Sequence, residues 1–142
     1  MSHQYNVNLK WNEGRVGEVF SPELNSKIEV ATPPQFPKGV EGVWSPEHFF
    51  TAAVNSCFMT TFLAIAENSR LEFKEFSCNA VGVLDKIEGK FLMTEVILNP
   101  TLIITKEEDK EKALRVLDKS EKACLISNSI TSKVSLNPTV IL

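Results

Sequence analysis

The residues of this sequence best suited to chemistry are its three cysteines, Cys57, Cys78 and Cys124. They lie far apart, form no C-x-x-C pair and are odd in number, so the pattern indicates neither a disulfide framework nor a zinc ribbon. The only histidines are His3 and His48, too few for a histidine-rich metal site, and no metal is expected. Free thiols are therefore predicted, and in a reducing compartment such thiols are usually inert core residues.

Thiol chemistry requires the thiolate, and the pKa of a free cysteine, about 8.5, must be lowered before the thiolate forms at neutral pH. A guanidinium can do this without losing its own charge, and Arg15 is the one arginine of the N-terminal strands. Cys57 and Cys124 both fall on inward-facing positions. A buried cysteine without a cation shifts its pKa upward, so a chemical role for Cys57 depends on a cation reaching it.

The stretch 45–68, SPEHFFTAAVNSCFMTTFLAIAEN, predicts a long helix with Cys57 in its middle. Ser45 can cap this helix, Pro46 fits its first position, and Glu47 favours the positive end of its dipole. The middle of the stretch carries no charge and leaves no polar face, so the helix must be buried. A membrane span is rejected because hydroxyl and amide side chains interrupt the run and amphipathic segments flank it.

The rest of the sequence predicts strands and one further helix. Alternation of apolar residues predicts strands over 4–11, 15–20, 27–31, 73–84, 90–104 and 134–142. Thr105 with Glu108 fits a capping box for a helix running to about Ala123, and Cys124 continues its inward stripe. That stripe consists of Ala113, Leu114, Val116 and Leu117. The pattern indicates one α+β domain, residues 1–142, with antiparallel sheets around the central helix, which a second subunit must help to cover.

Aromatic side chains gather in the loop 32–44, which is rich in proline and glycine, and on the central helix. A long ordered loop of this kind is often functional, and it can also be a surface loop with apolar anchors. Side chains on the buried helix are more often core than pocket. The candidate walls of an apolar pocket are Phe36, Trp44, Phe49, Phe50 and Phe58.

The composition fits a single soluble domain. Of its 142 residues 43% are hydrophobic and 23% charged, and the interspersed charges sum to −3, so neither a nucleic-acid nor an anionic-membrane surface is indicated. The N-terminal residues lack the basic and apolar regions of a signal peptide, so a cytoplasmic protein is expected.

Several motifs together resemble the OsmC/Ohr family of thiol-dependent hydroperoxide reductases. They are S-P-E-H-F-F at 45–50 with C-F at 57–58, C-L-I-S-N-S at 124–129, A-T-P-P-Q-F at 31–36, V-W-S-P-E at 43–47, and the arginine of the second strand. The resemblance spans nearly the whole chain. It departs from the family at Leu125, because many members have proline after the second cysteine.

The resemblance implies an intertwined homodimer with the family's fold. It further implies that Cys57 is the peroxidatic cysteine, Cys124 the resolving cysteine, Arg15 the activating arginine and Glu47 the carboxylate that orients Arg15. Organic hydroperoxides are the implied substrates and a dithiol, such as the dihydrolipoamide of a lipoylated protein, the implied reductant. No cofactor is expected.

Two alternatives stay open on the sequence. The same dimeric pocket could serve a binding or carrier module for a hydrophobic or thiol-reactive ligand, without turnover. Alternatively, both inward cysteines could be core residues of a structural dimer. Consumption of an organic hydroperoxide in the presence of a dithiol would separate an enzyme from both.

Overall fold

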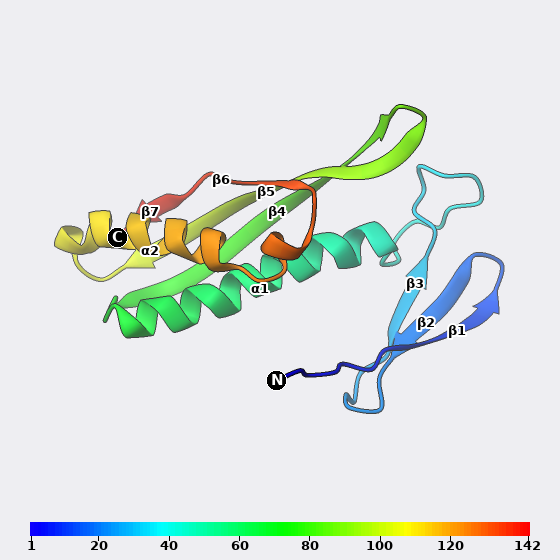
Figure 1. Ribbon diagram of the computed structural model, residues 1–142, viewed down its shortest axis with the longest axis horizontal. Helices are drawn as coiled ribbons and strands as arrows, with labels where there is room; N and C mark the ends of the chain where they lie inside the picture. Colours follow the sequence, from blue (N-terminus) through cyan, green and yellow to red (C-terminus); the bar gives the residue numbers. More distant parts are fainter. The chain divides into compact units, whose positions relative to one another are not determined.

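The computed structural model describes all 142 residues and divides into two compact units, Met1–Phe49 and Phe50–Leu142. The first unit contains three strands, β1 (Asn8–Glu13), β2 (Val16–Phe20) and β3 (Ile28–Ala31), which pair antiparallel in that order (Figure 1). The expected three-stranded meander is confirmed, although each strand begins or ends a few residues from its predicted position. Arg15 lies with Gly14 in the tight turn just before β2.

The loop 32–44 folds back on the strand that precedes it. The Val40 amide donates to the Thr32 carbonyl at 2.9 Å, and the Ala31 amide donates to the Trp44 carbonyl at 2.8 Å. The second bond is part of a bridge that pairs Trp44 with Val30. The end of the loop is therefore fixed beside β3, immediately before the helix begins.

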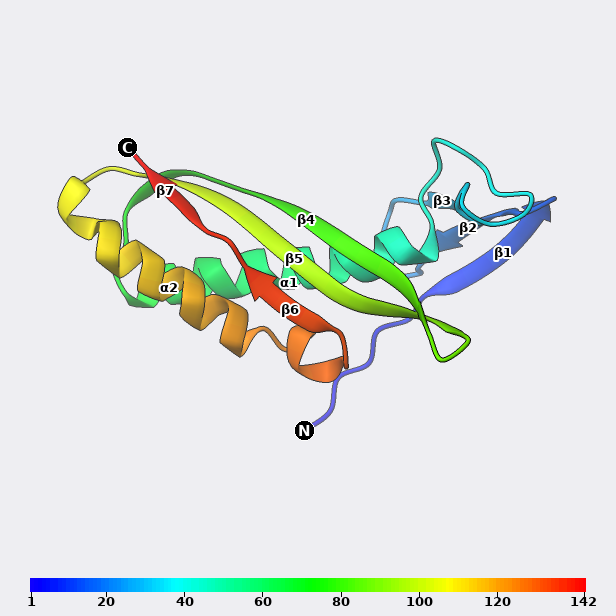
Figure 2. The ribbon, with the colours of Figure 1, turned by 90° about the horizontal axis from the view of Figure 1, so that it is seen from above.

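The second unit is a sheet with helices packed on it (Figures 1 and 2). Its elements in chain order are α1 (Pro46–Asn68), which starts in the first unit, β4 (Phe73–Ile87), β5 (Lys90–Ile104), α2 (Lys110–Ala123), β6 (Lys133–Leu136) and β7 (Thr139–Ile141), with short 3₁₀ turns at Glu107–Asp109 and Ser127–Ser129. The sheet order is β4-β5-β6, and β7 also pairs with β5. The long hairpin of β4 and β5 and both predicted helices are confirmed.

The prediction of a wholly antiparallel sheet is wrong at the edge formed by the C-terminal residues. The expected last strand is two short strands separated at Asn137 and Pro138, and both run parallel to β5. A parallel pair needs a crossover connection, and α2 supplies it by carrying the chain back along the sheet. The result is a mixed sheet.

The core of the second unit lies between this sheet and one face of α1. Val54, Phe58, Phe62 and Ala66 recur every four residues on α1 and are fully buried. They pack in one cluster with alternate residues of β5, namely Val96, Leu98, Leu102 and Ile104.

The other face of α1 is open in the single chain. On it, Met59 is 40% exposed and Leu63 is 44% exposed. The expectation of burial on every side is therefore met by this chain on one face only. By length and composition alone α1 could also span a membrane, a property it shares with core helices of soluble proteins.

Two details predicted for α2 are wrong. Thr105 caps no helix, because its hydroxyl donates instead to the Glu72 carboxylate at 3.2 Å, and a 3₁₀ turn precedes α2. Leu114 is 38% exposed, whereas Ser120, which a polarity pattern places outside, is buried and donates to the Val116 carbonyl at 2.6 Å. That bond satisfies the Ser120 hydroxyl within its own helix.

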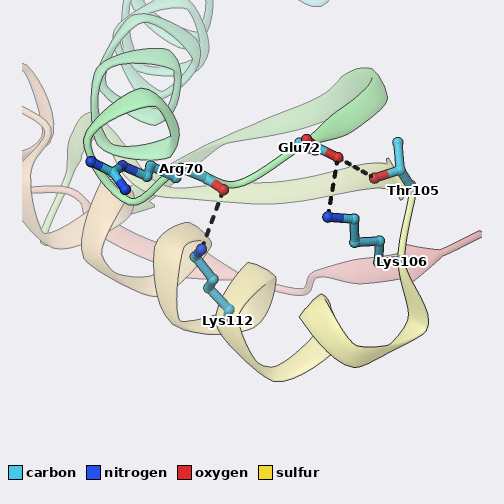
Figure 3. A network of polar contacts seen from close by, with 5 residues as sticks. All are labelled: Arg70, Glu72, Thr105, Lys106 and Lys112. Atoms are coloured by element: carbon cyan, nitrogen blue, oxygen red, sulfur yellow. Dashed lines mark hydrogen bonds and ion pairs between the residues drawn. The ribbon is translucent and has the colours of Figure 1, made fainter.

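The C-terminal end of α1 is tied to the start of α2 by polar contacts (Figure 3). The helix closes with Leu71 N–H donating to Ala66 C=O and Arg70 N–H donating to Glu67 C=O, a pattern that requires left-handed backbone at residue 70. Arg70 has φ of 55°. Its carbonyl accepts a bond from Lys112 Nζ at 3.3 Å, while Glu72 accepts one from Thr105 and pairs with Lys106 at 3.7 Å.

Arg70→Gly is expected to stabilise the protein by about 0.5–1 kcal/mol. Holding a non-glycine residue in left-handed backbone costs about 1–2 kcal/mol of stability. Glycine avoids this cost, but its greater freedom in the unfolded chain cancels part of the gain. The free energy of unfolding, measured in urea, checks this. Ser69→Gly is the matched control, because Ser69 has no positive φ and should only lose stability. Equal effects of the two changes would contradict the cap.

Candidate active site

The two cysteines predicted to act together do meet in the second unit. Cys57 lies in the middle of α1, and Cys124 is the residue that follows the last turn of α2, where the backbone becomes extended (φ −64°, ψ 114°). The Cys124 side chain is fully buried, and the two thiols are near enough that each shifts the pKa of the other. The Thr61 hydroxyl, one turn further along α1, lies 3.9 Å from Cys57 Sγ.

The surroundings of Cys57 favour its thiolate. Burial is the largest single influence and raises the pKa of Cys57. Hydrogen bonds to the sulfur act in the other direction and together outweigh burial, so the pKa of Cys57 is lowered. In decreasing order the donors are the Ile126 N–H, the Cys124 thiol, the Thr61 hydroxyl and the Leu125 N–H.

The surroundings of Cys124 favour its protonated form. Burial raises the pKa of Cys124, and the nearby hydroxyl and N–H of Ser127 offset this only in part. The hydrogen bond to Cys57 and the negative charge on Cys57 raise it further. The pair therefore has a defined polarity: the pKa of Cys57 lies below that of Cys124, so Cys57 ionises first.

Cys78 is not part of this pair. It lies on β4 opposite Pro100 of β5, packs against the core cluster, and has a pKa that burial raises to about 11. This placement agrees with the packing role expected for it. At neutral pH its thiol is almost entirely protonated and a weak nucleophile.

Arg15 and Glu47 lie together in the first unit, at a pocket of about 520 Å³. Arg15 is exposed in its turn, and Glu47 is half-buried in the first turn of α1. The remaining lining is largely apolar and comes from β1, β2, β3 and the loop after β3: Leu9, Trp11, Val16, Gly17, Val30, Ala31, Thr32, Pro33 and Phe36, with Pro46 of α1. A cation and a carboxylate are thus placed at the edge of an apolar cavity.

The five aromatic residues predicted as pocket walls are not equivalent. Phe36 lines the pocket at Arg15. Trp44 lines another hollow of the first unit and stacks on Phe49, with 5.6 Å between ring centres. In the second unit Phe58 is fully buried with its ring 5.9 Å from that of Phe76, and Phe50 packs at the border of the same core.

The start of α1 is held by a reciprocal pair of caps. Ser45, which is fully buried, accepts a bond from the His48 N–H at 3.2 Å, and the Ser45 N–H donates to His48 Nδ1 at 3.2 Å. The capping role of Ser45 is confirmed, and His48 completes the cap in the position that a Glu or Gln occupies in a capping box. The spacing of Ser45 and His48 could have revealed this role.

Other residues at the thiols escaped the sequence analysis. Thr61 lies four residues beyond Cys57, so helical spacing alone places it on the same face. The donors contributed by Leu125, Ile126 and Ser127 carry no such signal, because backbone amides have no sequence signature and the turn meets α1 only after folding.

Two sheets, two helices and a pair of neighbouring thiols with opposite pKa shifts define an α+β protein with a paired-thiol site. Comparison with protein families then assigns it. Residues 39–139 match the family of OsmC-like proteins, and the chain belongs to that family. The resemblance drawn from its motifs is confirmed.

Known relatives agree on the fold and differ in what is known of them. The chain is 25% identical to the uncharacterized protein YmaD of Bacillus subtilis, over 94% of this chain and 91% of that one. It is 26% identical to an OsmC-like protein of unknown function from Vibrio cholerae, whose structure has been solved. The two structures have a TM-score of 0.87, over 96% of this chain and 99% of that one. An organic hydroperoxide resistance protein from Elizabethkingia anophelis shares the fold at 24% identity, with a TM-score of 0.76 over 99% of each chain.

Proposed function

We propose that this protein is a thiol-dependent peroxidase that reduces organic hydroperoxides to alcohols. The observation that carries the proposal is the polarity of the thiol pair, in which Cys57 has a lowered pKa and Cys124 a raised one. A peroxidase of this type needs one thiolate to attack and one protonated thiol, within bonding reach, to resolve the product. Membership of a family whose structures include a hydroperoxide resistance protein supports the same reaction.

The reaction proceeds in two steps that balance. The Cys57 thiolate attacks the distal oxygen of ROOH, the O–O bond breaks, and the alkoxide takes up a proton and leaves as ROH. Cys57 is then a sulfenic acid. The Cys124 sulfur attacks the Cys57 sulfur, water leaves, and a Cys57–Cys124 disulfide forms. A dithiol, as on a lipoylated protein, returns both residues to thiols by exchange.

Arg15 and Glu47 are assigned the electrostatic part of the site. A guanidinium near the reacting sulfur stabilises both the thiolate and the departing alkoxide, and the carboxylate of Glu47 orients it. The apolar lining of their pocket, including Phe36, suits an organic R group. Because these two residues belong to the first unit and the cysteines to the second, we assign the site to a homodimer in the cytoplasm, with Arg15 and Glu47 of one subunit serving Cys57 of the other.

A steady-state assay with cumene hydroperoxide and dihydrolipoamide tests the proposal. Turnover that needs both reagents is expected. A protein that consumes no peroxide would instead fit the binding or carrier module. Titration of free thiols before and after peroxide then distinguishes a thiol-reactive carrier, which loses thiols, from a structural dimer, which does not.

Arg15→Ala is expected to slow alkylation of Cys57 by iodoacetamide near neutral pH by about tenfold, because a neighbouring opposite charge stabilises the ionised form by one pKa unit or more. Arg15→Lys should restore charge but not the planar fork of donors, and so recover part of the rate. Rates measured against pH, with alkylation assigned to Cys57 by mass spectrometry, check this. Arg115→Ala, which changes an exposed arginine of α2, is the control. Superimposable curves for wild type and Arg15→Ala would remove Arg15 from the mechanism.

A further inference from the structure

Two polar side chains of α1, Thr51 and Asn55, are half-buried against the strand β4. They lie one turn apart on the helix, so both fall on the same side of it. The Asn55 side chain donates through Nδ2 to the Cys78 carbonyl at 3.0 Å. Thr51 packs on Gly82, where a Cβ would clash with the Thr51 hydroxyl oxygen. The helix is thus held against β4 at two neighbouring points, one of them a hydrogen bond.

The Cys78 carbonyl needs a donor from outside the sheet. Cys78 pairs antiparallel with Pro100, and in such a ladder pairs that exchange two hydrogen bonds alternate with pairs that exchange none. Pro100 has no N–H, and two residues earlier Leu98 directs its carbonyl away from β4, to the Asn137 amide at 2.8 Å. Cys78 therefore belongs to a pair that exchanges no bonds. Its carbonyl faces the outer edge of β4, which is the last strand on that side of the sheet.

The other end of the Asn55 amide is not satisfied. Its Oδ1 is buried and has no hydrogen-bond partner. An unpaired buried acceptor costs stability, whereas an apolar side chain of the same branched outline would fill the place without that cost. What the amide supplies in return is direction. Apolar contacts are non-directional and tolerate small rotations of a helix, while a hydrogen bond weakens steeply when its angle changes.

We propose that Asn55 is a positioning residue for Cys57, and that its bond to the Cys78 carbonyl sets the rotation of α1 and with it the place of the Cys57 sulfur. Asn55 and Cys57 are two positions apart, which puts them on nearly opposite sides of the helix, about 160° apart around its axis. Any rotation that breaks the Asn55 bond therefore swings the sulfur as well. A sulfur about 5–6 Å from the axis moves by about 1 Å when the helix turns by about 10°.

A displacement of this size is large for the chemistry of the thiol pair. The Cys57 sulfur has to meet the sulfur of Cys124, which is fully buried at the end of α2 and cannot follow a rotation of α1. A misplacement of about 1 Å can lower a rate by roughly a hundredfold. This consequence rests on the proposed function, in which the two sulfurs form a disulfide. The tie between α1 and β4 does not.

Asn55→Leu and Asn55→Ala test the positioning role, the first with the same outline as asparagine and the second without any risk of overpacking. Diamide oxidises a thiol pair directly, taking up two electrons and two protons as the disulfide forms. Formation of the Cys57–Cys124 disulfide by diamide should be about ten- to a hundredfold slower in both variants than in the wild type. Asn79→Ala is the matched control, because it removes an amide bond of β4, from Asn99 Nδ2 at 3.3 Å, and should leave the rate unchanged.

Iodoacetamide labelling separates a misplaced sulfur from a loosened fold. In the Asn55 variants the buried Cys124 should stay as protected as in the wild type while disulfide formation slows. Wild-type disulfide rates in these variants, or slowing that comes with labelling of Cys124 or appears equally in Asn79→Ala, would overturn the proposal. If neither Asn55 variant folds, Gly82→Ala displaces α1 at Thr51 instead, and an unchanged rate there would overturn it too.

None of these measurements uses a peroxide. A protein that reduces no hydroperoxide, but whose disulfide forms slowly without the Asn55 amide, would refute the proposed peroxidase and leave the positioning role intact. A peroxidase whose Asn55 variants form the disulfide at the wild-type rate would do the reverse.

Discussion

Cys57→Ser is expected to abolish peroxide reduction, leaving only the uncatalysed background, whereas Cys124→Ser should still undergo one oxidation per chain. The first thiol attacks and the second only resolves, so the loss of Cys124 stops the cycle after the sulfenic acid. Mass spectrometry after one equivalent of cumene hydroperoxide should show sulfenic or over-oxidised Cys57 in Cys124→Ser. Cys78→Ser is the control and should turn over normally, because Cys78 has a pKa of about 11.

The opposite pKa shifts of the pair give the same assignment a second check. With the pKa of Cys57 below that of a free cysteine and that of Cys124 above it, alkylation should begin at Cys57 as pH rises, and reach Cys124 only at higher pH. Oxidation that appears at Cys124 in the Cys57→Ser protein, or alkylation that begins at Cys124, would reverse the two roles.

The sequence was sufficient where local chemistry decides structure. Ser45, Pro46 and the uncharged run behind them predicted both the start and the length of α1, since caps and helix-breaking residues act over a few positions. Alternation likewise predicted β4 and β5. The inward position of Cys124 followed from helical spacing, because the stripe of α2 continues into the residue after its last turn.

The sequence was not sufficient where contacts between distant segments decide structure. Thr105 has the spacing of a capping residue, yet Glu72 competes successfully for its hydroxyl. The direction of β6 depends on where α2 returns the chain, which no pattern within 133–136 specifies. At the site, the family motif indicated both cysteines, but the donors of the turn 125–127 depend on its approach to α1.

The position of Glu47 relative to Cys57 leads to the second large effect. The two residues are ten positions apart on α1, which runs unbroken from Pro46 to Asn68, so about 15 Å of helix rise separates them. A carboxylate cannot orient a guanidinium at the Cys57 of its own helix across that distance. If Glu47 and Arg15 serve Cys57, they must come from a partner, and the open face of α1 with Met59 and Leu63 offers that partner an apolar contact surface.

A mixture of two inactive variants should therefore regain activity. When Glu47→Ala and Cys57→Ser chains are unfolded and refolded together, about half of the dimers are mixed, and each mixed dimer has one site with both residues intact. The expected recovery is up to about a quarter of wild-type peroxidase activity, and each variant refolded alone is the control. Native mass spectrometry measures the fraction of mixed dimers. If each site lay within one chain, both subunits of a mixed dimer would have a defective site. Mixed dimers without recovered activity would therefore place all the catalytic residues within a single chain.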